Sequence, residues 1–181
     1  QGPYGIEFNR LDSVGNIQWQ QSINDFPNGG CKSMIQNQAG NFVIIGEATP
    51  PGQFAFEVFL AEINTDGGLL WQQFVEASQN SDAGFGIMEQ TDASGYIITG
   101  YGHNPSTSDT DIIISQIDAT GEELNRRYYE APGVGIGYDI KAVGNDYFLA
   151  TGFSDEDNNS QYFLTMDNYF LTAAETIEQP R

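Results

Sequence analysis

Three twelve-residue stretches of the chain resemble one another and decide its fold. They read FNRLDSVGNIQW at 8–19, LAEINTDGGLLW at 60–71 and ISQIDATGEELN at 114–125. Their turn residues Asp12, Asn64 and Asp118 recur about every 50 residues, and a fixed period of this length indicates a repeat architecture. A fourth, degraded copy begins with FLTMD at 163–167.

A second unit alternates with the first. NQAGNFVIIG at 37–46 matches TDASGYIITG at 91–100 and, more loosely, VGNDYFLATG at 143–152. Both units combine short runs of β-branched and aromatic residues with a glycine-containing turn, which is typical of a β-hairpin. No segment has the sustained apolar spacing of an amphipathic helix, so we predict an all-β fold.

The repeat count predicts an incomplete array. Two hairpins in each repeat predict antiparallel four-stranded units, and units of this size suggest β-propeller blades. We treat 1–181 as one domain, with repeats near 6–53, 54–107 and 108–157 and a half repeat at 158–181. That makes about three and a half repeats and fourteen strands, whereas closed propellers usually have about four to eight blades. Three interpretations stay open: a segment of a longer chain, two copies forming a seven-blade ring, or an open array completed by a partner.

The composition excludes several classes of protein. The 181 residues include 25 acidic and 6 basic side chains, for a net charge of −19. Such a surface repels nucleic acid and anionic membranes. No apolar stretch approaches the ~20 residues of a membrane-spanning helix. Cys31 is the single cysteine, so we expect neither an intrachain disulfide nor a thiolate zinc cluster.

One stretch carries a resemblance to a known repeat. NSDAGFGIMEQTDASGYIITG at 80–100 resembles the repeat of large secreted proteins of Bacteroidota, in which an acidic–glycine–aromatic lead-in precedes two hairpins. Residues 11–19 and 63–71 are similar to the second of those hairpins. The resemblance implies an extracellular or cell-surface β-propeller-like array, often exported by the type IX route. It implies no common catalytic activity.

Candidate catalytic groups are few. His103 is the only histidine and no Gly-x-Ser-x-Gly motif accompanies it, so we interpret it as a solvated loop residue. Arg126 and Arg127 are the only clustered bases, and strand alternation predicts that they point to opposite faces. Four carboxylates are explained by turns, in which aspartate binds nearby backbone N–H groups. These are Asp12, Asp66, Asp92 and Asp118.

One loop is a candidate calcium site. In SDEDNNS at 154–160, oxygen donors alternate at Asp155, Asp157 and Asn159, and Ca²⁺ favours clustered carboxylate and amide oxygens. The loop lacks the central glycine and distal glutamate of an EF-hand, and the sequence favours a solvated connecting loop instead. The same interpretation applies to Asp109 and Asp111. No other cofactor is predicted.

The two tryptophans have two interpretations. An exposed indole face at Trp19 or Trp71 would stack against a sugar ring. Both residues, however, share a repeat position with Asn125 and Ala174. An aromatic residue fixed in a repeat is more often a packing residue, so we favour packing between blades.

We therefore predict a non-catalytic structural, adhesive or assembly module of an extracellular or cell-surface complex. Its expected partners are other subunits, further repeats of a longer chain or a second copy, without nucleic acid or membrane insertion. Two alternatives remain. One is a glycan-binding module that uses tryptophan or tyrosine faces. The other is a propeller-type hydrolase, lyase or oxidoreductase with its site in the central channel.

Overall fold

The fold is all-β, as predicted. A computed structural model of the chain describes residues 5–23, 28–75, 80–130, 133–143, 147–154 and 160–167. Within these ranges there are thirteen strands and no helix, and hence no helix able to cross a membrane. The strands are β1 (Ile6–Leu11), β2 (Ile17–Ile23), β3 (Gly29–Gln36), β4 (Phe42–Ala48), β5 (Glu57–Ile63), β6 (Leu69–Val75), β7 (Ala83–Glu89), β8 (Gly95–His103), β9 (Thr110–Asp118), β10 (Glu123–Tyr129), β11 (Gly135–Val143), β12 (Tyr147–Ser154) and β13 (Ser160–Asp167).

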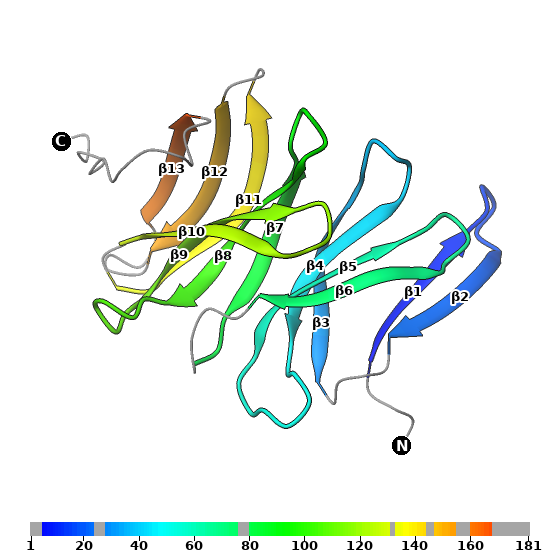
Figure 1. Cartoon of the computed structure of the whole chain (residues 1–181), viewed down its shortest axis with the longest axis horizontal. Coiled ribbons are helices and arrows are strands. Elements are labelled where there is room, and N and C mark those ends of the chain that lie inside the picture. The colour runs from blue at the N-terminus through cyan, green and yellow to red at the C-terminus, as the bar shows by residue number, and fades with distance from the viewer. Residues whose placement is uncertain are drawn as a thin grey trace.

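The strands form four antiparallel sheets that stand side by side in chain order (Figure 1). The first sheet is β1–β2, the second β3–β6, the third β7–β10 and the fourth β11–β13. Each four-stranded sheet joins a hairpin of the 37–46 kind to the following hairpin of the 60–71 kind. Of the hairpin that the half repeat at 158–181 predicts, the second strand lies outside the described residues.

The first strands of the last three sheets carry the same irregularity. The register of β3, β7 and β11 against the following strand shifts at one residue each, Lys32, Phe85 and Tyr138. Each shift is a β-bulge, in which an extra residue bends the strand and leaves the ladder. A bulge at the same place in three sheets shows that the sequence repeat is also a structural repeat.

The recurring glycines of the 37–46 kind of hairpin have a steric cause. Gly46, Gly100 and Gly152 pair with Cys31, Gly84 and Gly137, directly before each bulge. A Cβ atom on Gly100 would overlap the carbonyl oxygen of Ala83, and the other two glycines have the same conflict with the strand opposite. The close approach of the backbone at the bulge therefore requires glycine at these positions.

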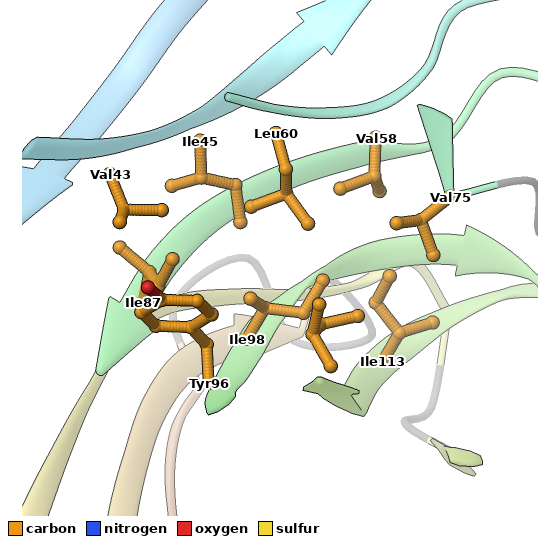
Figure 2. Packing of buried hydrophobic residues seen from close by; sticks show 10 residues of the cluster. Val43, Ile45, Val58, Leu60, Val75, Ile87, Tyr96, Ile98 and Ile113 are labelled. Atoms are coloured by element: carbon orange, nitrogen blue, oxygen red, sulfur yellow. The ribbon is translucent and has the colours of Figure 1, made fainter. Parts of the chain in front are cut away.

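The core lies between the sheets. Figure 2 shows Val43, Ile45 and Leu60 of the second sheet facing Ile87 and Ile98 of the third. Similar layers lie between the first and second sheets and between the third and fourth. Burying each such aliphatic side chain contributes about 1.5–3 kcal/mol, so contact between neighbouring sheets is the main source of stability.

One repeat position is buried in two sheets and exposed in a third. Met34, Ile87 and Ile140 occupy the same register, opposite Ile44, Ile98 and Ala150. Ile87 is 1% exposed and Ile140 0%, whereas Met34 is 57% exposed. The difference follows from the neighbours, because the sheet that precedes Met34 has two strands instead of four.

This pair of positions provides a matched test of the packing. Ile87→Ala should lower the free energy of unfolding by about 2–5 kcal/mol, because it leaves a cavity between two sheets. Met34→Ala, at the equivalent exposed position, should change it by no more than about 0.5 kcal/mol. Urea denaturation followed by circular dichroism measures both. Equal losses in the two variants would contradict the arrangement of the sheets.

Candidate functional site

The predicted calcium ligands lie in a part of the chain that is not described. Asp155, Asp157 and Asn159 fall between β12 and β13, outside the described residues. The calcium site therefore stays a prediction. Within the described ranges, no three His, Cys, Asp or Glu side chains are grouped so that they could hold a metal ion.

The equivalent loop one repeat earlier corrects part of the sequence interpretation. Asp109 is exposed, as expected for a solvated loop. Asp111 is instead buried, and its Oδ2 accepts a hydrogen bond from Asn104 Nδ2 (2.8 Å), which is buried too. The prediction of a solvated loop is therefore wrong for Asp111. Asp111 lies near the start of β9, and its hydrogen bond to Asn104 ties the loop to that strand.

His103 lies at the end of β8 and is half-buried, so its predicted place in a solvated loop is wrong. Its backbone N–H donates to Asp82 Oδ1 (2.9 Å). In a catalytic triad the carboxylate instead accepts from the imidazole and orients it. Here that carboxylate oxygen binds the backbone, so the contact fixes the strand end and does not prepare the ring for catalysis.

The two neighbouring arginines do not converge on one surface. Arg126 and Arg127 pair with successive residues of β9, Ser115 and Ile114, so their side chains leave the strand on opposite faces, as predicted. The Arg126 side chain is 9% exposed, and its Nε binds Glu123 Oε1 (2.8 Å) and Ser115 Oγ (3.2 Å). Arg126 therefore forms an ion pair within its own sheet.

The turn role is confirmed for Asp12, Asp92 and Asp118, and Asp92 Oδ1 accepts the N–H of Ser94. In the second sheet Asn64, and not Asp66, is the turn acceptor, so the prediction is wrong for Asp66. Asp12 Oδ1 accepts the N–H groups of residues 14 and 16, and Asp118 Oδ1 accepts those of residues 120 and 122. Asn64 Oδ1 makes the same two bonds in the sheet between them. Hydrogen bonds from Asn16 lower the pKa of Asp12. Burial raises the pKa of Asp118, but hydrogen bonds from Thr120 and Glu122 outweigh it and hold the pKa below its ordinary value.

Both tryptophans pack against the turn of the next sheet. A Cβ atom on Gly67 would come within 3.0 Å of the Trp19 ring, and one on Gly121 within 2.7 Å of the Trp71 ring. Trp19 Nε1 also donates to the Thr65 carbonyl in that turn (3.1 Å). The two rings are half-buried and serve as packing between sheets, which was the favoured interpretation.

Glu62 is a buried acceptor that sequence reasoning missed. Its Oε2 accepts from Trp71 Nε1 (2.6 Å), and its Oε1 accepts from the side-chain amides of Asn37 and Asn41 (2.8 Å each). Asn37 also donates to the Tyr96 hydroxyl (3.1 Å), in the third sheet. The same repeat position holds Arg10 and Gln116, so no pattern in the repeat could have indicated this network.

The bulged residues form a row across three sheets, which we call the bulge row: Lys32, Phe85 and Tyr138. Lys32 Nζ lies 5.5 Å from the centre of the Phe85 ring, and Phe85 meets Tyr138 edge to face at 5.6 Å. Tyr138 in turn stacks on Phe153, with ring planes 10° apart. Tyr138 is 48% exposed.

Comparison with known proteins identifies no family for the chain. No protein-family model matches the chain, and no curated protein matches it. The resemblance to the repeats of secreted Bacteroidota proteins therefore stays a prediction from the residues themselves.

The lowered pKa values predict how stability responds to acid. A carboxyl group with a depressed folded-state pKa stabilises the fold above its ordinary value of 3.8, and this stabilisation is lost as the pH falls through the folded-state value. Asp12→Asn with Asp118→Asn keeps the turns, since Asn64 makes the same bonds naturally. The double variant should therefore lose less stability between about pH 5 and pH 2.

Urea midpoints measured across that pH range provide the test. Asp66→Asn is the control, because Asp66 lies in the same kind of turn, where Asn64 and not Asp66 accepts the two turn bonds. An acid response in the double variant as steep as in the parent chain would contradict the role of the two carboxylates.

The calcium loop has a separate test. An ion that binds only the folded chain raises its thermal midpoint, and Asp157→Asn should remove that increase. A midpoint that is the same in millimolar Ca²⁺ and in chelator excludes a structural ion in the 154–160 loop. Asp109→Asn, in the equivalent loop one repeat earlier, is the matched control.

Proposed function

We propose that the chain is a non-catalytic assembly module: a propeller-like array of about three and a half repeats that joins further repeats or subunits through its ends. The observation that carries this proposal is the contrast at one repeat position. Met34 is exposed at the first complete sheet, whereas Ile87 and Ile140 are buried by the sheets that precede them.

The packing of neighbouring sheets supports continuation of the array. In repeat proteins each unit packs mainly on its neighbours, and an end without a polar cap leaves an apolar surface. The other end is similar: Leu149 of β12 is half-buried, although it stands where Val43 and Ile97 are buried in the preceding sheets. Both ends thus carry side chains that neighbouring repeats would bury.

The arrangement of the first strands supports the propeller form. β3 contacts β7, and β7 contacts β11, so the first strands of successive sheets are neighbours. In a propeller these would be the inner strands around the central axis. The fourteenth strand and the ring itself are part of this proposal.

The proposed setting is extracellular or at the cell surface. It rests on the resemblance to secreted Bacteroidota repeats. The charge of −19 supports a soluble module that binds neither nucleic acid nor anionic membrane. The proposed partners are protein: other subunits, further repeats or a second copy.

A glycan-binding module is the second candidate, and the bulge row favours it. Tyr138 is 48% exposed, and an exposed aromatic side chain can bind the apolar face of a sugar. The tryptophans do not support this function, because their rings pack on turns of the next sheet. Enzymatic activity is not part of the proposal, since the arginines that a channel site would need point to opposite faces.

Assembly through the ends has a direct measurement. At tens of micromolar, the chain should self-associate in size-exclusion chromatography with light scattering, because exposed side chains such as Met34 at the end of one molecule can be buried against another. Met34→Lys should weaken this association. Val14→Lys, in an exposed turn of the first sheet, is the control and should not. A monomer with a cooperative melt would contradict the proposal.

A further inference from the structure

Among the described residues, the first sheet has two strands, whereas the second and third sheets have four each. β5 pairs with both β4 and β6, and β9 pairs with both β8 and β10. β1 occupies the same repeat position as β5 and β9, yet among the described strands it pairs only with β2. One edge of β1 therefore presents backbone N–H and C=O groups on which another strand can add.

The adjacent face of β3 indicates what those strands would cover. Ile87 is covered by Val43 and Ile45, which belong to the β3–β4 hairpin of the preceding sheet. Ile140 packs in the same way against Ile97 of the β7–β8 hairpin. Met34 is at the matching register of β3 and is exposed. The group absent over Met34 is thus a hairpin of the 37–46 kind.

Cys31 adds information about the side chains of that hairpin. It shares a repeat position with Gly84 and Gly137. A Cβ atom on Gly84 would overlap the Ile45 side chain, and one on Gly137 would overlap the Thr99 hydroxyl. Where a preceding hairpin places isoleucine or threonine there, only glycine fits opposite. A cysteine fits only if the hairpin carries a smaller side chain.

We propose that the edge of β1, together with Cys31 and Met34 on β3, is a docking site for a β-hairpin of the repeat's own 37–46 kind. The hairpin carries glycine or alanine opposite Cys31. Its outer strand extends the ladder of β1, its apolar side chains cover Met34, and the first sheet then has four strands. This inference rests on the proposed function and names the partner for one end.

The test grafts such a hairpin onto the chain. A copy of residues 83–109, which contains β7, β8 and the natural connection to a third strand, is fused directly before Gly5. In the graft, the copied Thr99 is changed to Ala, so that a small side chain faces Cys31. Cys31 is the only cysteine of the chain and is exposed, so its rate of labelling by a maleimide reports whether the site is covered.

The graft should slow labelling at least tenfold and raise the thermal midpoint. Two control grafts differ by one residue each. With the copied Ile97→Asp, a charge lies over Met34 and labelling should stay fast. With Thr99 retained, protection should be weaker than with alanine. In this Thr99 graft, Cys31→Gly removes the clash, and protection should return. Because that variant has lost Cys31, Met34→Cys supplies the cysteine whose labelling is measured.

Unchanged labelling in a folded alanine graft would overturn the inference. If the extended chain does not fold, a synthetic peptide of residues 83–103 with Thr99→Ala, added to the parent chain, decides in its place: protection of Cys31 supports the site and no protection refutes it. The proposed function fails differently, by a monomeric parent chain. If the parent chain self-associates through Met34 but the grafts give no protection, the proposed function is supported and the hairpin docking site is refuted.

Discussion

The structure depends on the close approach of neighbouring sheets. Gly84 admits the side chain of Ile45, and Gly137 admits the hydroxyl of Thr99, so that each first strand lies directly on the sheet before it. The bulge that follows each of these glycines bends the strand and brings the next residue into the row formed by Lys32, Phe85 and Tyr138. If the first strands lay farther from the preceding sheets, the aliphatic side chains between the sheets could not pack against one another.

Much of this arrangement could be predicted from the chain, and the part that could not has physical reasons. Turns such as the one at Asp12 are local, since the side chain bonds an N–H two residues later, and their pattern is visible in sequence. Exposure at Met34 depends on how many strands the preceding sheet has, which no local pattern records. The prediction of a solvated Asp111 is wrong because a carboxylate that is buried in the fold looks the same in sequence as an exposed one.

The candidate functions require different arrangements of side chains. An assembly module needs only complementary ends, and the described end at β1 and β3 has an unpaired strand edge beside an exposed apolar residue. A glycan site needs an accessible aromatic side chain, and Tyr138 of the bulge row is 48% exposed. Catalysis needs converging polar groups. Among the described residues, Asp82 accepts the backbone N–H of His103, and the Arg126 side chain binds Ser115 and Glu123 of its own sheet.

The central claim is that, among the described strands, β1 has an open edge where the equivalent strands β5 and β9 are paired on both sides. Hydrogen exchange of the backbone amides measures this most directly, because an amide in a closed ladder exchanges only after opening. The amides of β1 that point away from β2 should exchange much faster than the equivalent amides of β5 and β9, which occupy the same repeat position with a strand on each side. Equal protection in all three strands, in a chain that is monomeric under the same conditions, would contradict the account.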